Sequence, residues 1–171
     1  MKILIVKLSS LGDVVHTLPA LSALRGAYPD AEIDWLVEEE SKAILEGNPL
    51  LNNIVTVRKR GLFREPGKTW RVVRRIRERR YDMVIDFQGL LKSGVWVYLS
   101  SGRRRIGFGR GREFSHLFLN EKLPPYDPDR HAVDRYLDLA RYAGGRVKTH
   151  YLNWWMRWSL KRISGTSKIY G

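Results

Sequence analysis

The first nineteen residues constrain the fold more than any other stretch of this chain. A continuous apolar run over residues 3–6 ends in a turn of small and polar residues: Ser9, Ser10, Gly12 and Asp13. Apolar side chains then return at helical spacing, at Val14, Leu18, Leu21 and Leu24. The pattern predicts a buried parallel strand, a tight turn and a helix. Because ligands bind at the carboxyl ends of strands in open parallel sheets, the turn is a candidate site.

The same alternation continues along the chain. We predict further strands at residues 31–37, 54–57 and 83–85, with Asp86 at the end of the last one. The 31–37 strand alternates enough in polarity to be partly exposed. A short strand is also possible at 117–119, whereas the Gly- and Arg-rich residues 103–112 are expected to form a loop.

Helices are expected between these strands. A short one begins at Ser41 as N-cap, and another covers 69–80 with Trp70, Val73 and Ile76 on its inner face. Residues 88–93 open a further helix, and 131–143 form the last. Four or five strands alternating with helices predict an α/β fold, a Rossmann-like parallel sheet with helices on both faces.

Length, charge and composition limit the possible functions. The 171 residues suffice for one well-packed domain with an appendage. A net charge of +13 indicates an anionic partner: nucleic acid, an acidic membrane surface, or a phosphorylated or carboxylated substrate. The absence of cysteine excludes disulfides and thiolate chemistry. The apolar start is too short for a signal peptide or a spanning helix, so we expect a cytoplasmic, soluble or peripheral protein.

The chain divides at about residue 145. Residues 1–145 carry the α/β pattern, whereas 146–171 form a basic, Trp-rich tail with Trp154, Trp155 and Trp158. No acidic residue follows Asp138. The tail could be translation in a shifted frame, the product of a truncated gene, or a terminal helix suited to a membrane interface.

Asp13 has two interpretations that can hold together. It could cap the first helix as its N-cap, because N-terminal N–H groups and the helix dipole favour a carboxylate there. It could also be a general base that takes a proton from an incoming hydroxyl at the mouth of the crevice. His16 lies three residues further on and is more simply explained as a structural histidine.

Two groups of basic residues attract attention. Arg58, Lys59, Arg60 and Arg64 leave the carboxyl end of a predicted strand, on the same rim as Asp13, and could hold an anionic ligand. The helix over 69–80 is rich in arginine and resembles a nucleic-acid-binding face. In both cases a solvated surface is the alternative.

Four segments together resemble a known family. They are Ser9-Ser-Leu-Gly-Asp-Val-Val-His-Thr-Leu-Pro19, Trp35-Leu-Val-Glu-Glu39, Val84-Ile-Asp-Phe-Gln-Gly-Leu-Leu-Lys-Ser93 and His131-Ala-Val-Asp-Arg135. In this order they are similar to the amino-terminal half of the lipopolysaccharide heptosyltransferases of glycosyltransferase family 9. The first and third segments favour the type I enzymes over the second-heptose relatives.

The resemblance implies a GT-B enzyme, built from two Rossmann-like domains that face each other across a cleft. Such an enzyme transfers heptose from ADP-heptose to a Kdo sugar of Kdo-lipid A with inversion, without a metal or another cofactor. Asp13 matches the family's proposed catalytic base. The expected substrate-binding residues are Ser9, Ser10, Gly12, His16, Arg58, Lys59, Arg60, Arg64, Gln88 and Lys92. The enzyme would work at the cytoplasmic face of the inner membrane, with no nucleic acid partner.

The tail departs from the family pattern. No strand, turn and helix of a second, nucleotide-sugar-binding domain is recognisable in residues 146–171. We therefore expect an interrupted enzyme, an acceptor-side half with negligible transferase activity alone. The alternatives are a nucleic-acid-binding module acting through the arginine helix and a membrane-surface protein anchored by the tail.

Overall fold

The computed structural model describes residues 1–59, 66–110, 112–124 and 130–146. Arg60, Arg64 and the tail from residue 147 onward, with its three tryptophans, lie outside the described residues.

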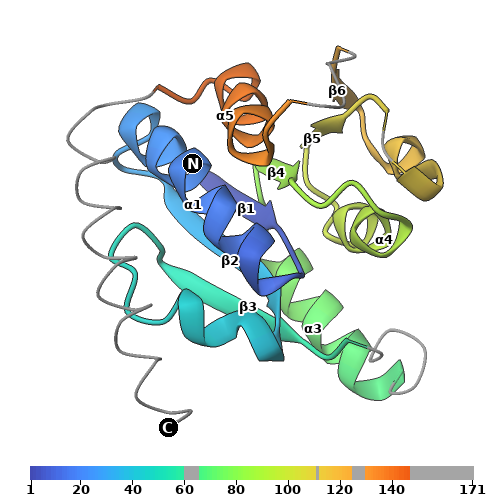
Figure 1. Cartoon of the computed structure of the whole chain (residues 1–171). Helices are drawn as coiled ribbons and strands as arrows, with labels where there is room; N and C mark the ends of the chain where they lie inside the picture. Colours follow the sequence, from blue (N-terminus) through green and yellow to red (C-terminus); the bar gives the residue numbers. More distant parts are fainter. Residues whose placement is uncertain (60–65, 111, 125–129, 147–171) are drawn as a thin grey trace, which may run out of the picture.

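The described chain is built on one parallel sheet (Figure 1). Its strands are β1 (Lys2–Val6), β2 (Glu32–Glu38), β3 (Asn53–Val57), β4 (Met83–Asp86), β5 (Arg104–Phe108) and β6 (Glu121–Leu123). They are arranged in the order β3-β2-β1-β4-β5-β6, and every neighbouring pair is parallel. This order confirms the Rossmann-like prediction. It reverses between β1 and β4, which is where open parallel sheets form their ligand crevice.

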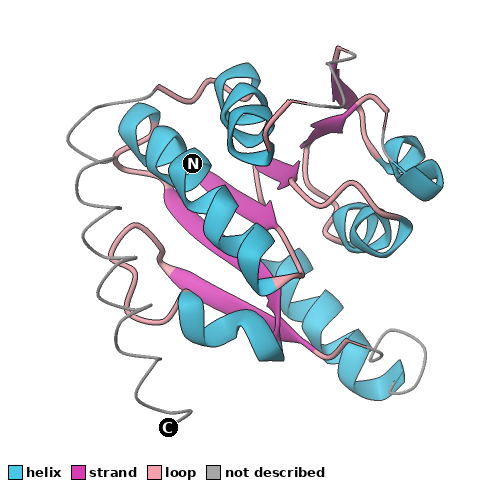
Figure 2. Ribbon diagram, viewed as in Figure 1, coloured by secondary structure: helices cyan, strands magenta, loops and turns pink. Residues whose placement is uncertain are grey.

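Helices cover both faces of the sheet (Figure 2). The α-helices are α1 (Leu11–Ala27), α3 (Pro66–Arg79), α4 (Leu91–Leu99) and α5 (Ala132–Tyr142), and two 3₁₀ segments are η1 (Glu39–Ile44) and η2 (Arg112–Phe118). None of these described helices has the length and apolar character needed to cross a bilayer.

Alternate residues of β1 divide the core into two layers. Ile3 and Ile5 pack in the cluster that contains the buried side chains of α1 and α5. Leu4 and Val6 pack in the cluster that contains those of α3 and α4. All four side chains are fully buried, as expected for a central parallel strand.

The prediction that β2 is partly exposed is wrong. Every residue from Ile33 to Glu38 is buried, because β2 lies between β1 and β3 and is covered on both faces. The polar residues within it have partners: Asp34 accepts a hydrogen bond from the Tyr81 hydroxyl at 2.6 Å and pairs with Arg79 at 3.0 Å. The apparent alternation therefore marked buried polar groups rather than a solvent face.

Two strands at the other edge were not predicted. The expected loop over 103–112 contains β5, and the expected strand at 117–119 lies at the end of η2, ahead of β6. Glycine permits the close packing here, since a Cβ on Gly107 would lie 2.7 Å from Leu119 Cδ1. One on Gly109 would lie 2.7 Å from the Leu123 carbonyl oxygen. The glycines that indicated a loop are thus required by strand packing.

The helix predictions are confirmed in position and corrected in detail. In α3, Val73 and Ile76 are buried, but Trp70 is 60% exposed and does not face the core. Ser41 lies inside η1 rather than at its N-cap. In α5 the fully buried positions include Leu139, whereas Val133 is only half-buried.

Candidate active site

The turn between β1 and α1 places Asp13 in the first turn of the helix, not at its N-cap. Ser10 is the N-cap, and Asp13 is the third helical residue. Its carboxylate reaches back so that Oδ2 accepts a hydrogen bond from the Ser10 backbone N–H at 3.3 Å and lies 3.5 Å from Ser10 Oγ. This arrangement satisfies an N-terminal N–H group and suits the helix dipole. Asp13 therefore stabilises the helix start, although from a position other than the one predicted.

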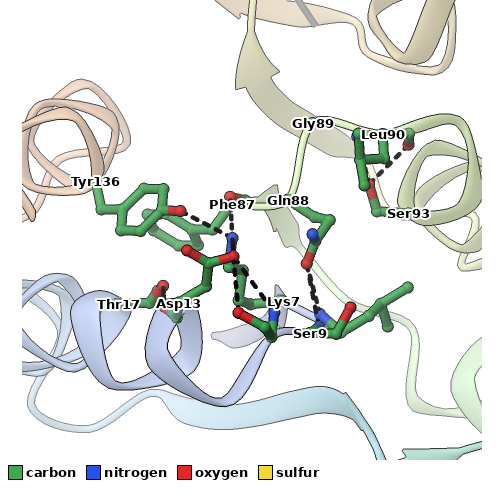
Figure 3. Close-up of polar contacts among 12 residues, drawn as sticks. Lys7, Ser9, Asp13, Thr17, Phe87, Gln88, Gly89, Leu90, Ser93 and Tyr136 are labelled. Carbon is green, nitrogen blue, oxygen red and sulfur yellow. Dashed lines mark hydrogen bonds and ion pairs between the residues drawn. The ribbon is translucent and has the colours of Figure 1, made fainter. Parts of the chain in front are cut away.

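A buried lysine contacts the same carboxylate. Lys7, at the end of β1, is 2% exposed, and its Nζ lies 3.7 Å from Asp13 Oδ2 (Figure 3). Nζ also donates to the hydroxyl of Tyr136 at 2.8 Å and to the carbonyl oxygen of Phe87 at 3.3 Å. The sequence analysis missed Lys7 and Tyr136 as site residues. The sequence did contain a signal for Lys7. A charged residue that directly follows a strand buried on both faces is itself often buried, and a buried charge needs hydrogen-bond or ion-pair partners.

All contacts of the Asp13 carboxylate with the described residues use the same oxygen, Oδ2. The side chain is nevertheless 40% exposed. Oδ1 itself makes no hydrogen bond or ion pair with the described residues, so it is available to a ligand. A carboxylate held in this way can accept a proton from a hydroxyl that approaches Oδ1.

The turn after β4 holds the turn after β1. The side-chain oxygen of Gln88 accepts hydrogen bonds from the backbone N–H groups of Leu8 at 3.1 Å and Ser9 at 3.2 Å (Figure 3). Gln88 is a predicted site residue, and the structure does bring it to the Ser9 turn. Its side-chain oxygen is engaged in fixing the backbone that leads to Asp13.

Asp86 fixes the turn that carries Gln88. Its Oδ1 accepts hydrogen bonds from the N–H groups of Gln88 at 2.9 Å and Gly89 at 3.1 Å, and its Oδ2 accepts one from Ser93 Oγ at 3.0 Å. Burial nevertheless raises the pKa of Asp86 to about 6, although these hydrogen bonds and the charge of Lys7 oppose the shift. Burial lowers the pKa of Lys7 from its ordinary value, against the attraction of Asp13 and Asp86.

The remaining predicted residues on this side have structural partners. The ring of His16 lies against that of His131, with centroids 5.7 Å apart, which ties α1 to the start of α5. Lys92 of α4 forms an ion pair with Glu38, which is buried at the end of β2. Gly12 is exposed, and no atom outside its immediate neighbours would lie within 4 Å of an added Cβ.

The basic rim begins at the carboxyl end of β3. Arg58 and Lys59 are both exposed, and Arg58 Nε lies 3.4 Å from Glu39 Oε2. Because β3 and β1 are separated only by β2, their ends lie roughly 10 Å apart. The parallel strand order therefore places Arg58 and Lys59 on the same rim as Asp13, whereas the prediction for Arg60 and Arg64 falls outside the described residues.

Several arginines of α3 have partners within the helix or in other elements. Arg74 pairs with Glu78 at 2.8 Å, Arg77 donates to Ser101 Oγ at 3.0 Å, and Arg79 pairs with the buried Asp34. These contacts favour the interpretation of this part of the helix as a structural and solvated surface. Among the described residues, no three His, Asp or Glu side chains converge as a metal site would require.

Comparison with known proteins gives consistent matches. The family model described as glycosyltransferase family 9 (heptosyltransferase) matches residues 69–166, more than half of the chain. Lipopolysaccharide heptosyltransferase 1 of Pseudomonas aeruginosa is 37% identical over 152 residues, covering 84% of this chain and 42% of that protein. The protein of the same name from Escherichia coli K12 is 36% identical over 157 residues, covering 86% of this chain and 49% of the relative.

Solved structures agree with the sequence matches. Escherichia coli heptosyltransferase WaaC with ADP-2-deoxy-2-fluoro heptose has a TM-score of 0.75 and 34% identity, over 86% of this chain and 50% of the other. The family 9 glycosyl transferase of Veillonella parvula has a TM-score of 0.74 and 25% identity, over 86% and 41%. The chain therefore spans about half the length of the relatives that it matches.

Proposed function

The chain belongs to glycosyltransferase family 9, and on this basis we propose that it forms the acceptor-binding side of an inverting heptosyltransferase. The transferred sugar would be heptose, the donor ADP-heptose, and the acceptor a Kdo sugar of Kdo-lipid A. The proposal requires no metal ion and no further cofactor. Its location would be the cytoplasmic surface of the inner membrane, because the acceptor is anchored there by its lipid chains.

One observation carries this proposal: at the reversal point of a parallel sheet, the carboxylate of Asp13 is held through Oδ2, and its Oδ1 has no partner among the described residues. In the proposed step the acceptor hydroxyl oxygen attacks the anomeric carbon of heptose from the face opposite ADP. The bond from that carbon to the ADP oxygen breaks, and its electron pair leaves with ADP. The hydroxyl proton passes to Asp13 Oδ1. Inversion follows because attack and departure occur on opposite faces.

The surrounding groups would position the base and the acceptor. Lys7 and the Ser10 N–H hold Asp13 Oδ2, while Gln88 fixes the turn at Ser9. The Ser9, Ser10 and Gly12 turn is lined by small residues, so a sugar can approach its backbone closely. His16, tied to His131 at the outer side of α1, would border that approach.

The cations of the rim suit the charges of the acceptor. Kdo carries a carboxylate and lipid A carries phosphates, which guanidinium and ammonium groups recognise. We assign this role to Arg58, Lys59, Arg60, Arg64 and Lys92. In the described part, Arg58 pairs with Glu39 and Lys92 pairs with Glu38. When the acceptor binds, each cation would either leave its glutamate for an anionic group of the acceptor or contact both.

Acceptor binding tests the proposal directly. The purified chain is titrated with Kdo-lipid A in detergent micelles and, as the matched control, with lipid A that lacks Kdo. We expect saturable binding to Kdo-lipid A. The affinity should be at least tenfold lower without Kdo, because the lost hydrogen bonds to the Kdo carboxylate should contribute about 1.4 kcal/mol, which corresponds to a tenfold change in the dissociation constant. Equal binding to both, or to micelles of any anionic lipid, would show a membrane-surface protein instead. Salt-sensitive binding to a DNA duplex without binding to Kdo-lipid A would support the nucleic-acid alternative.

Turnover tests the role of Asp13. We expect the 171-residue chain alone to release ADP from ADP-heptose and Kdo-lipid A only at the background rate, because its matched relatives are about twice as long. Turnover above background would contradict that expectation and would allow the base to be tested. Asp13→Asn should then reduce the rate by about 10²- to 10⁴-fold with acceptor affinity unchanged. A rate that Asp13→Asn leaves intact would remove Asp13 from the mechanism.

A further inference from the structure

A concave site lies on the same rim, beside the end of β3. It is a pocket of about 470 Å³ between η1, β3, α3 and α4, and its walls include Arg58, Lys68, Arg71, Val72, Arg75 and Trp96. Figure 1 shows α3 passing next to β3 on this side of the sheet. Neither Lys7 nor Ser10, the residues that contact Asp13, belongs to its walls. The pocket is therefore separate from the proposed base.

Helix α3 directs three cations into this pocket. Lys68, Arg71 and Arg75 are spaced three and four residues apart, so they share one face of the helix. Like charges at this spacing repel each other. Among the described residues that line the pocket, four are cations and one, Glu39, is a carboxylate, so this lining is positive. The energetic penalty of this clustering is relieved when an anion binds among the side chains.

The arginines in the pocket differ from the others on the helix. Arg71 and Arg75 are both exposed, and neither makes a hydrogen bond or an ion pair with any residue in the described ranges. By contrast, Arg74 has Glu78 as a partner and Arg79 has Asp34. Two guanidinium groups one helical turn apart can together hold the oxygens of one phosphate.

The floor of the pocket indicates what accompanies the phosphate. Val57, Val72 and the largely buried Trp96 supply the apolar part of the lining, which we call the floor. The volume lies within the range of small-molecule sites and exceeds what a phosphate ion needs. An apolar floor with a cationic wall fits a sugar ring that carries a phosphate monoester. The volume suits one sugar phosphate rather than the several nucleotides that an extended nucleic acid strand presents.

We propose that this pocket is a binding site for a phosphorylated saccharide, with Arg71 and Arg75 as the groups that bind the phosphate. The assignment rests on the proposed function only for the source of the sugar, which would be the phosphorylated glucosamine of the lipid acceptor. Phosphate recognition itself depends on the pocket alone. A free sugar phosphate is the other source of the same chemistry.

The experiment measures binding of three small probes to the whole chain by calorimetry at constant ionic strength: glucose 1-phosphate, inorganic phosphate and glucose. Glucose 1-phosphate should bind most tightly, inorganic phosphate more weakly because it lacks the ring, and glucose not measurably. Arg71→Gln and Arg75→Gln should each weaken glucose 1-phosphate binding about tenfold. Arg74→Gln is the matched control, since it removes the same charge from the same helix outside the pocket, and it should change the affinity less than twofold.

The outcomes separate this inference from the proposed function. Equal loss of affinity in the Arg74 and Arg71 variants, or equal binding of glucose and glucose 1-phosphate, would overturn the phosphate site. Kdo-lipid A binding could still survive in that case and support the proposed function. If the probes bind as expected, Kdo-lipid A and its dephosphorylated form distinguish the sources. If the parent chain binds dephosphorylated Kdo-lipid A more weakly than Kdo-lipid A, and Arg71→Gln binds the two equally, the lipid acceptor is the source of the phosphate. If dephosphorylation does not change the affinity of the parent chain, the source is a free sugar phosphate.

Discussion

Replacing Asp86 by asparagine should remove a specific pH dependence from the stability of the fold. Asn keeps the shape of the side chain, and its carbonyl oxygen can still accept from the N–H groups of Gln88 and Gly89. Its amide can donate to Ser93 Oγ, because the Ser93 hydroxyl has a second acceptor in the Leu90 carbonyl at 2.8 Å. The substitution thus removes the ionisable group while retaining most of its contacts.

The sign follows from the raised pKa of Asp86, about 6 in the folded state against 3.8 as the ordinary value. Between these two values the folded protein binds more protons than the unfolded chain, so the free energy of unfolding falls as the pH rises. Below pH 3.8 both states are protonated, and above pH 6 both are ionised. A pKa difference of about 2 corresponds to about 3 kcal/mol, of which roughly 2 to 3 kcal/mol falls between pH 4 and pH 7.

Urea unfolding of the parent chain and of Asp86→Asn at half-unit steps from pH 4 to pH 7, followed by circular dichroism, measures this difference. We expect the stability of the parent, relative to Asp86→Asn, to decline by that amount as the pH rises. A constant difference would mean that folding does not raise the pKa of Asp86 above its ordinary value. A difference of opposite sign would mean that the hydrogen bonds from Gln88, Gly89 and Ser93 outweigh burial, which would refute the reasoning. Asp86→Ala serves as a control that should be less stable at every pH, because it leaves N–H groups without an acceptor.

Two further substitutions test the packing of the sheet. Arg79→Met should lower the free energy of unfolding by about 2 to 3 kcal/mol, because it removes the cation beside the buried carboxylate of Asp34. The control Arg74→Met removes an exposed ion pair and should lower it by less than about 0.5 kcal/mol. Similar urea midpoints for the two variants would contradict this prediction. Gly102→Ala should cost about 1 to 3 kcal/mol, since the new Cβ would lie 2.3 Å from Val84 Cγ2. A variant with the melting temperature of the parent would show that the loop yields without cost.

The sequence predicted the parts of the fold whose signal is local. The apolar run of β1 and the spaced leucines of α1 depend on neighbouring residues, and both elements formed where expected. Strand β5 was missed because Gly107 and Gly109 indicate a loop when they are considered alone. Their reason lies across the sheet, in the side chain of Leu119 and the backbone of Leu123, and local composition does not report such long-range contacts.

The site was predicted to a similar extent. Asp13 and Gln88 were singled out, and they do lie on the two turns that the sheet brings together. Lys7 was missed because a lysine after an apolar run is usually a surface residue, and its partner Tyr136 is 129 positions away. Lys92 was assigned to ligand binding because of its charge, but its ion pair with Glu38 depends on the pairing of distant elements.

The unequal surroundings of the two oxygens of Asp13 have a consequence for selectivity. A sugar acceptor presents several hydroxyl groups of nearly equal acidity, so acidity alone cannot decide which one reacts. A carboxylate with one oxygen held by the protein favours whichever hydroxyl the bound sugar turns toward the other oxygen. Lys7, which contacts Oδ2, would thereby influence the regiochemistry of the new glycosidic bond without touching either sugar.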